Sequence, residues 1–154
     1  MKRAVLPVCA LLVAPALSAQ QFTPGGILPG GNIWTEGVAL SDVEHDGDLD
    51  IFLANGDGFS SPGTQRQSLL LINQLEISVG TFVDETALRL PVFLSNGRSA
   101  VLADVQGDGW EDCMITNAFN PDPPFLLINR GDTQPGFFDE EGAARGFTEA
   151  LSSG

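Results

Sequence analysis

The chain has 154 residues with 20 acidic and seven basic side chains, a formal net charge of −13 and two cysteines. This strong negative charge argues against nucleic acid or an anionic membrane surface as a partner. Cys113 is the lone cysteine beyond the N-terminal region, so we expect no disulfide framework. It lies in an apolar run, which predicts a small buried hydrophobic side chain rather than a reactive thiol.

The N-terminus has the layout of a secretory signal peptide. Lys2 and Arg3 precede an apolar stretch over residues 4–17, and small residues lead up to Ala19. We therefore expect residues 1–19 to be removed, which would shift the formal net charge from −13 to −15. Fourteen apolar residues are too few to span a bilayer comfortably, and no later stretch is long and apolar enough. The sequence thus predicts a secreted, periplasmic or cell-surface protein without a membrane span.

Two sets of four short apolar runs follow in chain order. Turn residues bound each run, which is typical of strands, and only residues 85–90 and 140–145 indicate a helical turn. Four strands in about 60 residues is the size of one propeller blade. The predicted fold class is all-β, with about two four-stranded blades of an incomplete β-propeller. The predicted strands cover residues 37–41, 51–55, 69–73, 82–85, 99–103, 113–117, 125–129 and 137–140.

These runs divide the chain into repeats. Residues 20–36 hold a leading strand or partial repeat that begins near Phe22. Residues 37–97 form repeat 1 and residues 98–154 form repeat 2, whose pattern is cut off at the C-terminus. A repeat unit buries its apolar face against a neighbour, so fewer than about three are seldom stable alone. We therefore expect self-association or further repeats.

Two acidic loops carry the chemistry of this sequence. Residues 42–50 and 104–112 both read D-V-[E/Q]-x-D-G-x-x-D, and they start 62 residues apart. Oxygen-bearing side chains recur at positions 1, 3, 5 and 9, with glycine at position 6. Ca²⁺ takes six to eight oxygen ligands, and a glycine allows the chain to turn sharply around it. The first loop carries carboxylates at Asp42, Glu44, Asp46, Asp48 and Asp50, and the second carries oxygen atoms at Asp104, Gln106, Asp108 and Asp112.

Three other interpretations of these loops compete with calcium. A metal-free, solvated Asp-Gly hairpin would use the same turn residues. An EF-hand needs a bidentate glutamate at position 12 and flanking helices, whereas position 12 is Leu53 or Ile115 and the flanks resemble strands. Mg²⁺ demands a tight octahedron and keeps its waters, so it fits many flexible oxygens less well than Ca²⁺.

The order of these motifs resembles the FG-GAP/VCBS repeat family, the calcium-loop β-propeller repeat also found in integrin α-subunits. The resemblance covers residues 22–154 and rests on Gly-x-Ala-x-x-Asp, the acidic loop, Asp-x-x-x-x-Asn, Leu-x-x-Asn and Phe-x-Asp. It implies up to two Ca²⁺ ions, with position 7 supplying a backbone carbonyl from Asp48 or Trp110. The chain departs from the family at position 3, where it has Glu44 and Gln106. Gln106 removes one charge, so we expect the second loop to bind more weakly.

The expected role is a binding, scaffold or adhesion module with a protein or carbohydrate ligand, and not an enzyme. No catalytic constellation is visible, and the single histidine, His45, occupies a variable loop position where we expect it to face solvent. Asn73 and Asn129 occupy equivalent points and are expected to cap hairpins. The alternative is a non-catalytic fragment, or the propeller part of a larger exported enzyme such as a polysaccharide lyase.

Overall fold

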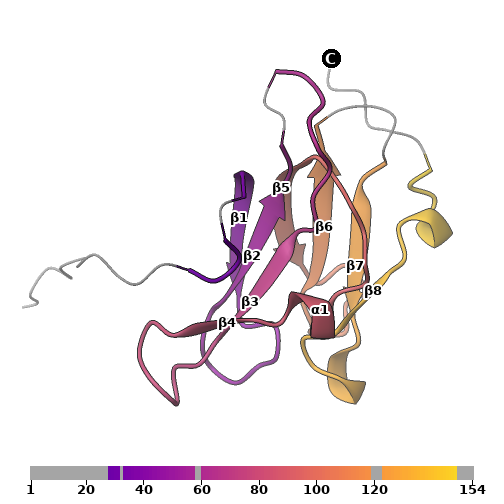
Figure 1. The fold of residues 1–154 in the computed structure, drawn as a ribbon. Coiled ribbons are helices and arrows are strands. Elements are labelled where there is room, and N and C mark those ends of the chain that lie inside the picture. The colour runs from indigo at the N-terminus through magenta and orange to yellow at the C-terminus, as the bar shows by residue number, and fades with distance from the viewer. Residues whose placement is uncertain (1–27, 32, 58–59, 119–122, 149–154) are drawn as a thin grey trace, which may run out of the picture.

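The computed structural model describes residues 28–31, 33–57, 60–118 and 123–148, and within them the fold is all-β. Two four-stranded antiparallel sheets follow one another along the chain, each with its strands in chain order (Figure 1). The sheets stand as two blades in a propeller-like arrangement and do not close into a barrel. The predicted signal peptide and the predicted leading strand near Phe22 lie outside the described residues.

Every predicted run within these residues forms a strand. The first sheet contains β1 (Thr35–Ser41), β2 (Asp50–Asn55), β3 (Leu69–Asn73) and β4 (Phe82–Asp84). The second contains β5 (Gly97–Ala103), β6 (Asp112–Asn117), β7 (Phe125–Asn129) and β8 (Phe138–Glu140). The predicted helical turns are present as α1 (Thr86–Arg89) and the 3₁₀ turn η2 (Ala143–Arg145), and a further 3₁₀ turn, η1, covers Gly131–Thr133.

The two sheets have the same register. In each, the first two strands pair with a shift near their start, between Thr35 and Gly37 in one sheet and between Gly97 and Ser99 in the other. Residues in β1 and β2 match those 62 positions later, and residues in β3 and β4 match those 56 positions later. The six-residue difference lies between the second and third strands. Each position in the first sheet therefore has a defined counterpart in the second.

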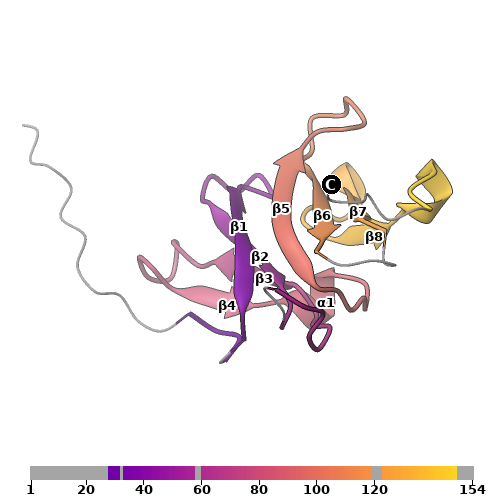
Figure 2. The same cartoon turned by 90° about the horizontal axis from the view of Figure 1, so that it is seen from above.

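The core lies between the two sheets, because β1 lies beside β5 and the sheets pack face to face (Figure 2). The rings of Phe52 and Phe138 meet edge to face across this interface, with centroids 6.1 Å apart. Cys113 is fully buried in the same core, as predicted, and burial raises the pKa of its thiol. The core comprises Val43, Phe52, Ala54, Leu70, Ile72, Leu90, Phe93, Ala100, Cys113, Ile115, Leu127 and Phe138.

A glycine allows a close approach of the two sheets. A β-carbon at Gly37 would lie 2.7 Å from Cα of Ser99, closer than such atoms come in proteins. Beside this contact, Arg98 of β5 forms an ion pair with Glu36 of β1. In the described part of the chain, no helix is long and apolar enough to cross a membrane.

Candidate functional site

The acidic loops follow the first strand of each sheet, and the carboxylate at position 9 anchors both in the same way. Asp50 accepts hydrogen bonds from the backbone N–H of Val43 at 3.1 Å and of Asn73 at 2.9 Å. Asp112 accepts equivalent bonds from Val105 at 3.1 Å and from Asn129 at 2.9 Å. Both aspartates are only 1% exposed. Each therefore fixes the start of its loop against the third strand of its sheet.

The carboxylate at position 1 holds the turn in both loops. Asp42 accepts hydrogen bonds from the N–H groups of Asp46 and Gly47, both at 2.9 Å. Its counterpart Asp104 accepts from the N–H groups of residues 107, 108 and 109, at 2.6, 3.1 and 2.8 Å. These three donors lower the pKa of Asp104 from its ordinary value, with the N–H of Gly109 contributing most.

The carboxylate at position 5 lies inside the turn. Oδ1 of Asp46 accepts from the N–H of Asp48 at 3.1 Å, and Oδ1 of Asp108 accepts from the N–H of Trp110 at 3.0 Å. The three aspartates of each motif thus have matching backbone partners in the two loops. The sequence motif therefore encodes one local structure twice.

The backbone dihedral angles confirm this equivalence. Position 6 has a positive φ in both loops, 99° at Gly47 and 91° at Gly109, which explains the glycine in the motif. Position 4 also has a positive φ, 56° at His45 and 76° at Gly107. His45 is the one non-glycine residue with positive φ in the described part of the chain.

An arginine contacts the side chain at position 3 in each loop, a contact that the loop motif alone does not predict. Nη1 of Arg89 lies 2.5 Å from Oε2 of Glu44, and Nη2 of Arg145 donates to Oε1 of Gln106 at 2.9 Å. Both arginines end a helical turn and pair with a glutamate four residues earlier. The recurring Glu-x-x-x-Arg at residues 85–89 and 141–145 was the sequence signal for this contact.

Burial and like charges make the first loop electrostatically unfavourable without a cation. Burial raises the pKa of Glu44 to about 7, although Arg89 acts in the opposite direction. Burial likewise raises the pKa of Asp50 to about 6. The pKa of Asp48 is also raised, by burial and by the charge of Asp46, and its Oδ1 is buried without a hydrogen-bond partner. An added cation would relieve these costs.

The second loop shows a weaker form of the same electrostatics. Burial raises the pKa of Asp112, and the charges of Asp108 and Asp104 add to this shift. Position 7 is Trp110, which has no side-chain oxygen, and position 3 is the neutral Gln106, whose Nε2 lies 3.5 Å from Oδ2 of Asp108. The loop therefore concentrates less negative charge than its counterpart.

The structure brings the predicted ligand residues into their two loops but does not converge them on a preformed centre. In the described residues, no three Asp, Glu, His or Cys side chains lie close enough together to hold a metal ion. Asp42, Asp46, Asp104 and Asp108 are partly or fully solvent-accessible, and each accepts hydrogen bonds from the backbone of its own turn.

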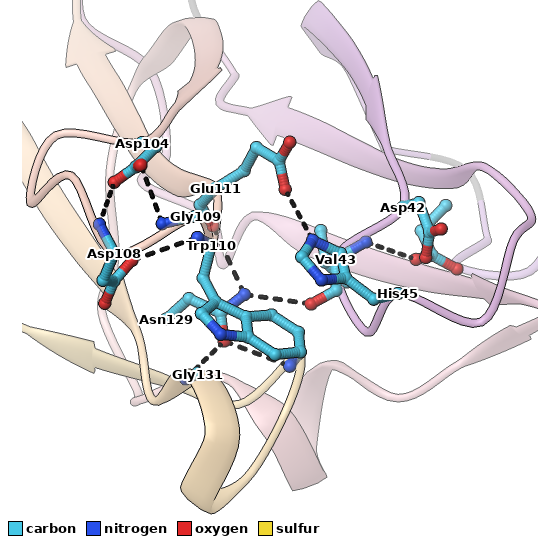
Figure 3. A network of polar contacts seen from close by, with 12 residues as sticks. Asp42, Val43, His45, Asp104, Asp108, Gly109, Trp110, Glu111, Asn129 and Gly131 are labelled. Atoms are coloured by element: carbon cyan, nitrogen blue, oxygen red, sulfur yellow. Dashed lines mark hydrogen bonds and ion pairs between the residues drawn. The ribbon is translucent and has the colours of Figure 1, made fainter.

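A polar network joins the two loops (Figure 3). The ring of His45 stacks on Trp110 at a centroid distance of 3.9 Å, and its Nε2 lies 3.5 Å from Oε2 of Glu111. Trp110 donates its ring N–H to Oδ1 of Asp132 at 3.3 Å. His45 is exposed to solvent, as predicted, with 42% of its side chain accessible, but its ring also stacks on the neighbouring loop, which the sequence did not predict.

Asn129 is the centre of the same network. Its Nδ2 donates to the carbonyl oxygens of Val43 at 2.9 Å and Glu111 at 3.3 Å, and its Oδ1 accepts from the N–H groups of Gly131 and Gly136. Asn129 thus caps its hairpin, as predicted, and also links the two sheets. Its counterpart Asn73 donates to the Leu49 carbonyl oxygen, but its buried Oδ1 has no partner, so the predicted hairpin cap is absent there.

Comparison of the chain with family models, curated proteins and solved structures finds no match.

The raised pKa values predict that lowering the pH stabilises the metal-free protein. Glu44 and Asp50 have folded-state pKa values above their ordinary ones, about 7 and about 6, so the folded state binds more protons between about pH 4 and pH 7. Their contribution to stability is present at the acid end of this window and is lost as the pH rises. Melting temperatures in chelator should therefore fall from pH 5 to pH 8.

Glu44→Gln should reduce the fall in melting temperature near pH 7, the pKa of Glu44. Glu76→Gln, at an exposed residue, should leave the dependence of melting temperature on pH unchanged. Excess Ca²⁺ should raise the melting temperature most at high pH. A melting temperature that rises from pH 5 to pH 8 in chelator would contradict the predicted sign.

Proposed function

We propose that this chain is an exported calcium-binding protein of the FG-GAP/VCBS repeat type, whose propeller-like blades serve as a binding or scaffold module. One observation carries the proposal: two loops 62 residues apart hold their carboxylates at positions 1, 5 and 9 with the same backbone hydrogen bonds. A solvated turn needs no such repeated arrangement of acids.

The donor set suits a hard cation. Each loop offers carboxylate oxygens on both sides of a tight turn, and Ca²⁺ is bound by oxygen ligands in flexible geometry. The buried Oδ1 of Asp48 has no hydrogen-bond partner in the described part of the chain, so it offers a further oxygen ligand. The proposed ligands are Asp42, Glu44, Asp46, Asp48 and Asp50 in the first loop, and Asp104, Gln106, Asp108, Trp110 through its carbonyl, and Asp112 in the second.

A bound cation would act here as a cross-link and not as a catalyst. Position 9 ties each loop to the third strand of its sheet through Asp50 or Asp112. A cation at these oxygens would join the turn, the first strand and the third strand of one blade. In a protein with one buried, unpaired cysteine in the described residues, such ions would take the place of disulfides.

Calorimetric titration of chelator-stripped protein with Ca²⁺ tests this proposal. We expect up to two sites with sub-millimolar to millimolar dissociation constants, as in extracellular modules. At a free Ca²⁺ concentration ten times the dissociation constant, each site should add about 1.4 kcal/mol of stability. Asp46→Ala and Asp108→Ala should each remove one site, and Asp84→Ala, outside both loops, is the control. An unchanged melting temperature and no heat at several millimolar Ca²⁺ would refute the proposal.

We further expect the first site to be the tighter one. Its position 3 is Glu44, whereas the second loop has the neutral Gln106. Asp46→Ala should therefore remove more Ca²⁺-dependent stability than Asp108→Ala, and Gln106→Glu should reduce the difference. The shift in melting temperature between chelator and Ca²⁺ measures both effects. Equal or reversed losses would show that the extra carboxylate does not set affinity.

A further inference from the structure

The two sheets contact each other through faces that do not correspond in the shared register. The first sheet contributes the face that carries Ala39, Phe52 and Ala54, together with Val43 just beyond β1. The second sheet contributes the face that carries Ala100, Leu102, Cys113 and Ile115. Each sheet therefore has one face in the core and one face outside it.

Because the two sheets share one register, each residue on an outer face can be compared with its counterpart 62 positions away in the other sheet. Val38 and Leu40, on the outer face of the first sheet, are 61% and 57% exposed. Their counterparts 62 positions later are Ala100, which is buried, and Leu102, which packs on the core. The outer face of the first sheet thus corresponds to the inner face of the second.

The converse holds for the second sheet. Val101 and Val105 are 54% and 52% exposed. Their counterparts are Ala39, which packs on the core, and Val43, which is 1% exposed. One chain therefore presents both halves of a contact that it already makes once internally, and both halves expose apolar side chains.

We propose that a second copy of this chain packs head to tail on the first, in the manner of the internal sheet–sheet contact. Ser99 takes the place of Gly37 there, so the two copies lie slightly further apart at this point than the two sheets of one chain. The outer face of the second sheet, with Val101 and Val105, covers the outer face of the first sheet of the next copy, with Val38 and Leu40. Such a contact is heterologous, so it generates a ring if the rotation closes and a filament if it does not. It goes beyond calcium binding and does not depend on it.

The polar groups at the two faces follow the same template. Inside the chain, Nδ2 of Asn129 donates to the carbonyl oxygen of Val43 across the interface. In the new contact, Asn73 takes the place of Asn129, and the carbonyl of Val105 from the neighbouring copy takes the place of that of Val43. Within one chain, Nδ2 of Asn73 donates to the carbonyl oxygen of Leu49, as Nδ2 of Asn129 does to that of Glu111, so the neighbouring copy would supply the second acceptor.

Apolar side chains also match. Phe82, a counterpart of the interface residue Phe138, is only half-buried, and it would meet Met114, the counterpart of Phe52. Glu36 and Arg98 are already paired with each other inside one chain, so the new contact rests on apolar side chains and the asparagine bond. The high net negative charge opposes association.

The occupant is a second copy because the matching faces belong to the same chain. Any other partner would have to reproduce the apolar pattern and the carbonyl acceptor that this chain itself supplies. Propellers contain about four to eight blades. A closed ring of this two-bladed chain would therefore contain two to four copies.

Light scattering coupled to size exclusion, over a range of concentrations, tests the proposal on the full chain, expressed with its own leader and purified after export. Val38→Arg blocks one face and Val101→Arg blocks the other, and both reduce the net negative charge. Loss of association in these variants would thus reflect lost fit and not added repulsion. Leu88→Arg, on the exposed surface of α1, is the matched control.

We expect the wild-type protein and Leu88→Arg to have the mass of two to four chains, or larger if the ring stays open. Each single-face variant alone should be a monomer that keeps a cooperative melt. An equimolar mixture of the two variants should form a one-to-one dimer, because each retains the face that the other lacks. This recovery also proves that both variants are folded.

Two results would overturn the proposal. A wild-type protein that remains a monomer at about 100 μM would show that copies do not cover these faces. Single-face variants that still self-associate, or a mixture that stays monomeric, would show that the contact does not run head to tail. Parallel runs in chelator and in Ca²⁺ separate this outcome from a failure of the calcium proposal.

Discussion

Replacing Asn129 by alanine should lower the free energy of unfolding by about 3–4 kcal/mol, whereas Asn73→Ala should cost about 1 kcal/mol. The two residues occupy the same place in their sheets, so Asn73→Ala serves as the control for Asn129→Ala. The side chain of Asn129 makes four hydrogen bonds and is 2% exposed. That of Asn73 donates one, to the Leu49 carbonyl oxygen. Removing the Asn129 side chain leaves buried donors and acceptors unpaired on both sheets, and each unpaired buried group costs its full desolvation free energy.

Urea denaturation of both variants, in chelator and at low protein concentration, measures this difference. Low concentration keeps the outer faces free of a second copy, so Asn73 is tested in the single chain. Asn129→Asp retains the acceptor for the hairpin N–H groups but places a buried carboxylate against the carbonyl oxygens of Val43 and Glu111, so it should cost at least as much as Asn129→Ala. Equal losses for Asn129→Ala and Asn73→Ala would mean that the link between the sheets contributes little.

Phe138→Ala should cost about 3–5 kcal/mol, and Phe82→Ala about 1 kcal/mol. Phe138 is 2% exposed and meets Phe52 edge to face in the interface between the sheets. Truncation there leaves a cavity bounded by both sheets, which cannot collapse easily. Phe82 is the counterpart on the outer face and is only half-buried in the single chain.

Denaturation midpoints in the Val38→Arg background check this second comparison, because that variant excludes a neighbouring copy. The same pair measured in an associated wild-type protein should show a larger loss for Phe82→Ala than in the monomeric background. A loss for Phe82→Ala in the monomeric background that equals the loss for Phe138→Ala would contradict the difference in packing.

The sequence predicted the strands well because each apolar run is short and ends at turn residues. Both helical turns were also predictable, and so was the repetition of the acidic loops. Strand patterns report which residues prefer a sheet but not which face of one sheet meets the next. The exposure of Val38 beside the burial of Val43 could therefore be known only from the three-dimensional arrangement.

The residues that surround the candidate site were harder to predict. Arg89 lies 45 positions after Glu44, and Asn129 lies 86 positions after Val43, so neither contact is local. His45 was expected in solvent because its loop position varies, but Trp110 of the other loop stacks on it. Such contacts depend on how the sheets pack, which neither loop encodes alone.

The close approach at Gly37 sets a geometric constraint on any assembly of these blades. Because a β-carbon there would strike Cα of Ser99, even one methyl group acts as a wedge between neighbouring sheets. A second contact of the same kind lies just beyond β2, where a β-carbon at Gly56 would lie 2.6 Å from Cα of Asn96. A larger side chain at either glycine would therefore push the two sheets apart before it disturbed the pairing of strands within one sheet.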